Sequence, residues 1–174
     1  MPKTRPDVLQ IRVELGGKVF EGDLQAEARV DPDPVGLNQA LAEQPGRFAW
    51  WATLEVLARS LVEELERDRA TKHAELYSFY EASLSATDTD GKRAKPTVDK
   101  IKSEILKHAD YRQLQGRLAA ATEQHGLLTV ARQTMQMRKD VLLAVASNLR
   151  AERDAHIHDQ LKETRERLRA RGRA

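Results

Sequence analysis

The sequence predicts a mainly α-helical protein, in which long antiparallel helical hairpin or coiled-coil rods follow a small N-terminal β-hairpin. Two long stretches, from about Phe48 to Ala82 and from about Thr97 to Leu149, carry apolar residues at helical spacing. The polar segment 83–96 between them contains the turn formers and the proline of a loop. Of the 174 residues, 40% are hydrophobic and 32% are charged, which suits long helices with one buried stripe better than a compact globule. We expect the rods to assemble as a homo-oligomer.

The N-terminal residues 1–33 are predicted to form a β element. Apolar and polar residues alternate over 11–15, and Gly16-Gly17 then supplies the positive φ angles of a tight hairpin turn. Alternation resumes over 24–30, which predicts a third short strand. This element is interpreted as a structural sheet or as an edge used in oligomer assembly.

A helical core domain is predicted over residues 34–150. Asp33 can cap a first short helix and Pro34 suits its first position. That helix should end near Gln44, because the residue before a proline avoids the helical conformation. A long helix is then expected to begin at about Arg47. Its apolar stripe is predicted to consist of Trp50, Leu54, Leu57, Leu61 and Leu65, widened by Ala58 and Val62.

Trp50 and Trp51 are adjacent, so on a helix they point about 100° apart. One ring can therefore fill a seam within the chain while the other contacts a neighbouring subunit. We expect replacement of Trp51 with alanine to weaken assembly more than secondary structure.

The second stretch restarts at Pro96-Thr97, and Asp110 with Gln113 resembles a capping box at a helix break. Between Tyr111 and Leu149 the sequence keeps a heptad phase with three polar positions: His125, Arg132 and Lys139. This pattern favours antiparallel packing on the first long helix or on neighbouring subunits. The basic tail, residues 151–174, is helical by propensity but has few apolar anchors, so it is expected to become ordered on binding.

Several functional classes lack their sequence signatures. The chain has no cysteine, and no glycine-rich loop is followed by the Lys-Ser/Thr of a phosphate site. His156 and His158 are two residues apart, so they point away from each other on a helix and do not suggest a metal site. We expect a protein that is not an enzyme and that holds no metal and no cofactor. No apolar run approaches a membrane span, and the cytoplasm, of the host cell for a phage protein, is the expected location.

Cations stand beside aromatic residues at the point where the first long stripe weakens. Positive charge binds phosphates and flat rings stack with unpaired bases, so this combination is typical of single-stranded nucleic-acid binding. The candidate residues are Arg67, Arg69, Lys72, His73, Tyr77, Tyr80, Lys92, Arg93, Lys95, Lys100 and Lys102. Under the alternative interpretation, the rings belong to the core and the cations form a solvated rim.

Residues 48–150 resemble the UvsY-type recombination mediators of T-even phages in the order of their features. The matching segments are Phe48-Ala49-Trp50-Trp51, the basic run 67–73, the aromatic run 76–80, and segments 98–102, 105–110, 138–143 and 149–150. The loop around Gly91 differs from the glycine-rich basic loop of the T-even members. The N-terminal hairpin and the basic tail lie outside the resemblance.

The resemblance implies a non-enzymatic, homo-oligomeric and ring-like protein that binds single-stranded DNA. Such mediators help a RecA-like recombinase to replace single-strand-binding protein. In the family, a basic pair just before the aromatic segment contributes to DNA binding. This position falls within Arg67 to His73 here, and we assign it to Arg69 and Lys72. The alternative is a structural or adaptor coiled-coil protein, such as a phage assembly component, with no nucleic-acid partner.

Overall fold

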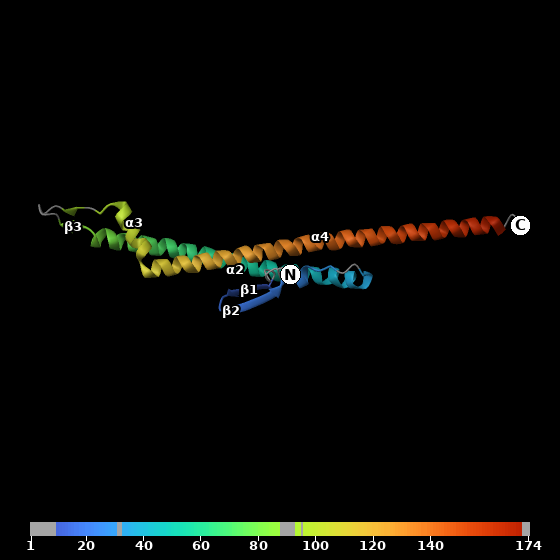
Figure 1. Cartoon of the computed structure of the whole chain (residues 1–174), viewed down its shortest axis with the longest axis horizontal. Helices are drawn as coiled ribbons and strands as arrows, with labels where there is room; N and C mark the ends of the chain where they lie inside the picture. The colour runs from blue at the N-terminus through green and yellow to red at the C-terminus, as the bar shows by residue number, and fades with distance from the viewer. Residues whose placement is uncertain (1–9, 31–32, 88–92, 95, 172–174) are drawn as a thin grey trace, which may run out of the picture. The chain divides into compact units, whose positions relative to one another are not determined.

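The computed structural model describes residues 10–30, 33–87, 93–94 and 96–171, and these are mainly helical, as predicted. The elements in chain order are β1 (Gln10–Leu15), β2 (Lys18–Asp23), α1 (Leu24–Ala28), α2 (Pro34–Ser83), β3 (Ala86–Thr87), β4 (Arg93–Ala94), α3 (Val98–Lys107) and α4 (Ala109–Arg171) (Figure 1).

The chain divides into two compact units. Among the described residues, unit 1 contains residues 10, 22–30, 33–51 and 131–171, and unit 2 contains residues 11–21, 52–87, 93–94 and 96–130. Both long helices, α2 and α4, contribute residues to each unit.

The predicted N-terminal hairpin is confirmed as the antiparallel pair β1–β2. Gly16 and Gly17 form its turn with φ angles of 58° and 75°, a conformation that glycine adopts without steric cost. Every second residue of β1 is buried, which matches the predicted alternation. The predicted third strand is wrong, because residues 24–28 form α1 instead. Asp23 caps this helix by accepting a hydrogen bond of 3.0 Å from the backbone nitrogen of Ala26.

Unit 1 brings the first turns of α2 against the middle of α4. Leu37 packs with Leu142 and Ala146, so the two helices run in opposite directions there. Asp33 caps α2 as predicted, because its carboxylate accepts hydrogen bonds from the backbone nitrogens of Val35 and Gly36. The predicted end of this helix near Gln44 is wrong.

Helix α2 continues through Pro45 to Ser83 without interruption. A proline inside a helix removes one backbone hydrogen bond, but tertiary contacts made on both sides of it hold the helix together. Gln44 supplies one such contact, since its side chain is buried and bonded to α4.

Trp51 is 1% exposed and its indole nitrogen donates a hydrogen bond of 2.9 Å to Glu27 of α1. Gly22 lies so close to this ring that an added Cβ would stand 2.7 Å from it. Trp50 is 38% exposed. Trp51 is therefore the internal ring and Trp50 the exposed one. The effect of Trp51→Ala on assembly stays a prediction.

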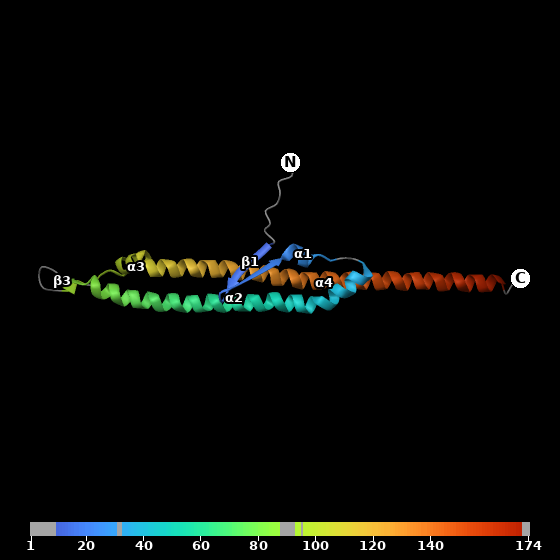
Figure 2. The ribbon, with the colours of Figure 1, turned by 90° about the horizontal axis from the view of Figure 1, so that it is seen from below.

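In unit 2, α2 and α4 lie side by side and antiparallel (Figures 1 and 2). Leu65 packs with Leu118 and Ala121, and Leu76 forms a cluster with Tyr111 and with residues of α3. The first predicted stripe is partly wrong, since Leu57 is 48% exposed. Ala58, which was predicted to widen the stripe, is buried. Thr97 caps α3, as a restart at Pro96-Thr97 predicts.

The predicted break before the last helix lies at His108, whose backbone N–H donates to the carbonyls of Glu104 and Ile105. Helix α4 begins at Ala109, so Asp110 lies within its first turn and does not cap it. Of the three predicted polar seam positions, His125 and Arg132 are half-buried and Lys139 is exposed. Arg138, one residue earlier, is buried instead.

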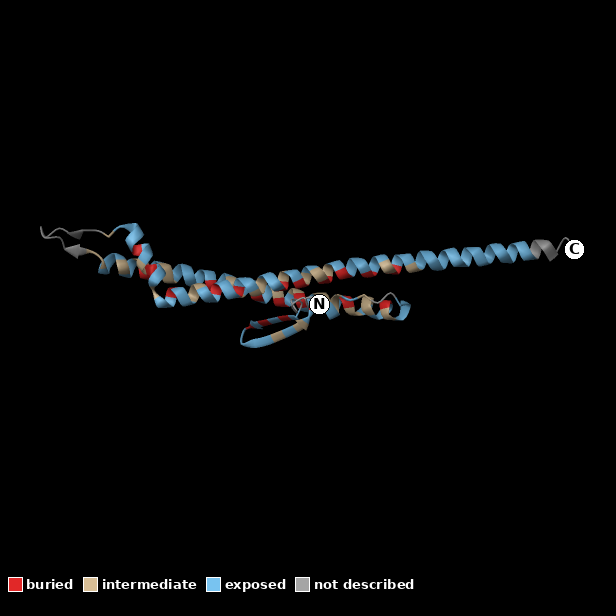
Figure 3. Ribbon diagram, viewed as in Figure 1, coloured by how far each residue is buried: buried red, intermediate tan, exposed pale blue. Residues whose placement is uncertain are grey.

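Helix α4 continues through the tail to Arg171, so the helix expected there from propensity is confirmed. Ordering on binding stays a prediction. Residues 151–167 are all exposed (Figure 3). The segment is rich in Ala, Leu, Glu, Lys and Arg, whose helix propensity is high, so it is helical without a packed face.

Candidate nucleic-acid interface

The predicted site residues occupy three segments of unit 2. On α2, Arg67 and Arg69 are exposed, whereas Lys72 and His73 are half-buried. Lys100 and Lys102 are exposed on α3. Lys92 and Lys95 lie outside the described residues, and Arg93 stands in β4, opposite Thr87 in the short ladder with β3.

The predicted stacking rings are partly taken up by packing. Tyr77 and Tyr80 lie against the buried cluster of Leu76, Ile101, Ile105 and Tyr111. The His73 ring stacks with Tyr77 at a centroid distance of 6.4 Å. Phe79 differs from its neighbours because it is 61% exposed. Among these α2 rings, Phe79 therefore presents the most open face for a base.

Lys72 lies where α2 faces the start of α4. Its Nζ is 3.4 Å from Glu75 Oε2 and 3.8 Å from Asp110 Oδ2. A shallow cavity of about 220 Å³ adjoins it, lined by Lys72, Asp110, Gln113, Leu114 and Arg117. The cavity thus brings a cation of α4, Arg117, to the same place as Lys72.

Helix geometry shows which of the remaining α2 residues lie on the same side of the helix as Lys72. Arg69 is three residues before it and is its neighbour on the helix surface. Phe79 is seven residues after it, which places the two within about 20° of one helix face and roughly 10 Å apart along the axis. Arg67 points about 140° away from Lys72. We call Arg69, Lys72 and Phe79 of α2, together with Arg117 of α4, the Lys72 surface.

Two members of this surface were not singled out from the sequence. Arg117 lies beside the seam residues Leu114 and Leu118, so a flank position was foreseeable from the heptad phase. Its position beside Lys72 depends on the antiparallel register of α2 and α4, which no local pattern encodes. Phe79 belonged to the aromatic run, and only the packing of α3 distinguishes it from the two tyrosines.

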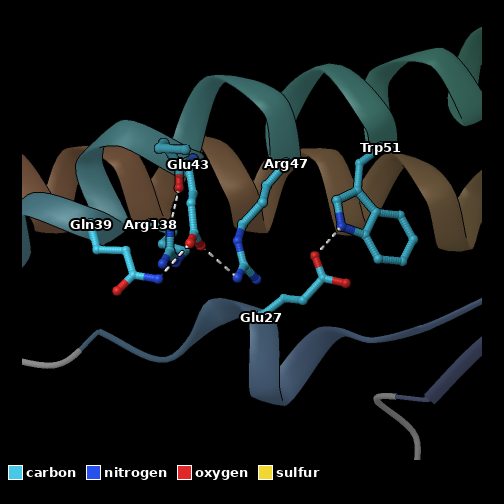
Figure 4. Close-up of polar contacts among 7 residues, drawn as sticks. Glu27, Gln39, Glu43, Arg47, Trp51 and Arg138 are labelled. Atoms are coloured by element: carbon cyan, nitrogen blue, oxygen red, sulfur yellow. Dashed lines mark hydrogen bonds and ion pairs between the residues drawn. The ribbon is translucent and has the colours of Figure 1, made fainter. Parts of the chain in front are cut away.

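Unit 1 contains a second polar cluster (Figure 4). The Gln44 side chain donates to the Met135 carbonyl at 2.6 Å and accepts a hydrogen bond from Arg138. Burial lowers the pKa of the Arg138 guanidinium, and the positive charge of Arg47 adds to this effect. Hydrogen bonds from Gln39 and Arg47 lower the pKa of Glu43. This cluster fixes side chains across the seam and has no nucleophile beside a base.

Across the part of the chain that the structure describes, no group of three or more His, Cys, Asp or Glu side chains is placed to hold a metal ion. Among the same residues, no helix combines the length and the apolar character needed to cross a membrane. Comparison of the chain with protein-family models, with curated protein sequences and with solved structures finds no match.

Proposed function

We propose that this chain binds single-stranded DNA through the Lys72 surface. The observation that carries the proposal is the cavity that Lys72 and Arg117 share in unit 2. Helix geometry places Arg69 and the exposed Phe79 on the same side of α2 as Lys72. Cations along one flank match a phosphate backbone, and an exposed ring offers a base a stacking partner worth about 1–3 kcal/mol. Lys100 and Lys102 on α3, and the loop cations Lys92, Arg93 and Lys95, are the next candidates to extend this path.

We further propose the role of a recombination mediator, which loads a RecA-like recombinase onto DNA in place of single-strand-binding protein. Its support is the ordered resemblance of residues 48–150 to UvsY-type mediators, in which the basic pair falls on Arg69 and Lys72. A homo-oligomer, ring-like in that family, would present the surface several times to one strand. Repeated sites raise the overall affinity without any new contact.

A salt series of binding titrations with a labelled DNA single strand tests the binding proposal. The triple variant Arg69→Ala/Lys72→Ala/Arg117→Ala should weaken binding and flatten the dependence of log K on log salt, by roughly 0.7 for each lost phosphate contact. Arg67→Ala is the matched control, because it removes an exposed α2 cation that points away from this surface. Equal affinities and slopes for the triple variant and the unaltered chain would place any DNA contact elsewhere.

Phe79→Leu separates stacking from packing. Loss of an exposed stacking ring should weaken DNA binding at constant thermal stability, whereas loss of a core ring lowers stability. Tyr80→Leu provides the contrast, since Tyr80 packs against the buried cluster.

Strand exchange by a RecA-like recombinase on DNA coated with single-strand-binding protein tests the mediator role. Addition of the unaltered chain should shorten the lag before exchange, and the triple variant should not. A chain that binds DNA but leaves the lag unchanged would retain the binding proposal and contradict the mediator role.

A structural or adaptor coiled-coil protein without a nucleic-acid partner is the second candidate. It is favoured by large apolar residues that α4 exposes, such as Met137 at 66% and Leu143 at 52%, because oligomer contacts commonly cover such side chains. Absence of DNA binding at low salt, together with a stable oligomer in sedimentation, would select this function.

A further inference from the structure

A groove in unit 1 lies between the first turns of α2 and the part of α4 that follows the Gln44–Arg138 contact. Its volume is about 410 Å³, within the range of roughly 300–1,000 Å³ that is usual for ligand pockets. The lining residues are Pro34, Leu37, Asn38, Leu41, Ala146, Leu149, Arg150 and Arg153. The groove lining includes no residue of the Gln44–Arg138 contact and none of the Lys72 surface.

The groove combines an aliphatic floor with a cationic rim. Leu37 and Ala146 are buried at 4% and 9% exposure, and Leu41 and Leu149 are half-buried beside them. Arg150 and Arg153 are exposed and three residues apart, so they are neighbours on the surface of α4. Within the residues that the structure describes, neither arginine forms an ion pair with a carboxylate.

We infer that this groove binds an acidic peptide segment of another protein, in which large apolar side chains stand next to carboxylates. The apolar side chains would cover Leu37, Leu41 and Leu149. The carboxylates would bind Arg150 and Arg153, because the planar guanidinium matches a carboxylate with two parallel hydrogen bonds. The Asn38 amide on the rim offers a donor and an acceptor to a peptide backbone.

Charge argues against the chain's own tail as the occupant. The segment 162–174 holds six cations against two carboxylates, Glu163 and Glu166. Its net charge is therefore positive, like that of the groove rim, and the two repel each other. DNA is disfavoured for a different reason. The floor is aliphatic and the lining contains no aromatic ring, so an unpaired base finds no stacking partner there.

The inference is independent of the proposed function, because the groove belongs to unit 1 and the Lys72 surface to unit 2. Its test is fluorescence anisotropy of the full chain with a short labelled peptide that alternates aspartate with leucine and phenylalanine. Two control peptides replace either the aspartates with asparagine or the apolar residues with serine. We expect saturable binding of the first peptide and much weaker binding of both controls.

The double variant Arg150→Glu/Arg153→Glu should weaken peptide binding by about tenfold or more, since two attractive contacts become repulsive. Lys162→Glu/Arg165→Glu is the matched control: it makes the same change in charge at exposed positions of the same helix, outside the groove. Leu41→Ala should also weaken binding, because it removes apolar contact area from the half-buried floor of the groove.

Three results would overturn the inference. Equal losses for the two double variants would show general attraction to a basic helix. A loss of single-stranded DNA binding specific to Arg150→Glu/Arg153→Glu, without any peptide binding, would assign the groove to nucleic acid. Dissociation of an oligomer by that variant in sedimentation would show that a second copy of the chain covers the groove.

Discussion

Units 1 and 2 both contain parts of α2 and α4. Within each unit, different side chains fill the space between these two helices. In unit 2, Leu65, Leu76 and Leu118 are buried on the facing sides of α2 and α4, and Ile101 and Ile105 of α3 join them. In unit 1, Gln44 and Arg138 are buried among the apolar residues and bonded to each other.

The two kinds of contact have different effects: apolar burial mainly stabilises the pair of helices, and a buried polar pair mainly fixes their alignment. Apolar side chains gain free energy from burial but tolerate sliding, whereas a buried polar pair is satisfied in only one alignment. We therefore expect unit 2 to respond most to lost volume and unit 1 to lost polar partners. Four experiments, from the largest expected effect to the smallest, test this contrast and the polar contacts of each unit.

Ile105→Ala should be the most destabilising change. Ile105 is 1% exposed, and truncation of such a side chain to alanine costs about 2–5 kcal/mol of unfolding free energy. Thermal and denaturant unfolding measure the loss, and hydrogen exchange should place it in unit 2. Leu106→Ala is the matched control, because Leu106 is 55% exposed on the same helix. Similar losses for both variants would show that α3 is not anchored by the buried cluster.

Gln44→Ala should cost about 1–3 kcal/mol, because the buried Arg138 guanidinium and the Met135 carbonyl each lose a partner. The double variant Gln44→Leu/Arg138→Met should recover most of this stability, since apolar replacement of a buried polar pair is often neutral or stabilising. A double-mutant cycle with denaturant unfolding measures the coupling. If the losses simply add, the two side chains do not act as a pair.

Glu75→Gln/Asp110→Asn should strengthen single-stranded DNA binding by a few-fold, because each exposed ion pair that competes for Lys72 is worth about 0.2–1 kcal/mol. Glu63→Gln is the control, since its ion pair partner is Arg59 and not Lys72. Titration with labelled DNA at low salt gives the comparison. Unchanged affinity would mean that Lys72 makes no phosphate contact.

Glu43→Gln should have the smallest effect, and the effect should depend on pH. Hydrogen bonds from Gln39 and Arg47 lower the pKa of Glu43 in the folded chain, so its contribution is present above the pKa of the unfolded chain. The contribution is lost as the pH falls through the lowered folded pKa. Unfolding titrations from neutral to acidic pH should therefore converge for the variant and the unaltered chain. A difference that grows on acidification would contradict this assignment.

The sequence predicted secondary structure most accurately where the pattern involved only neighbouring residues. The hairpin with Gly16-Gly17, the cap at Asp33 and the restart at Thr97 each depend on a few neighbouring residues, and the structure has all three. The predicted stop before Pro45 failed because contacts distant in sequence override a local preference. The predicted strand at 24–30 failed because Asp23 caps a helix there.

The sequence by itself determined the helical class, the apolar stripes and the presence of cations beside aromatic residues on α2. Tertiary structure alone decided which flank of each stripe is buried, and so left Leu57 exposed beside the buried Ala58 and Lys139 exposed beside the buried Arg138. It also brought Arg117 to Lys72 and left Phe79 exposed. The physical reason is register: a helix presents several nearly equivalent faces, and only the facing helix selects among them.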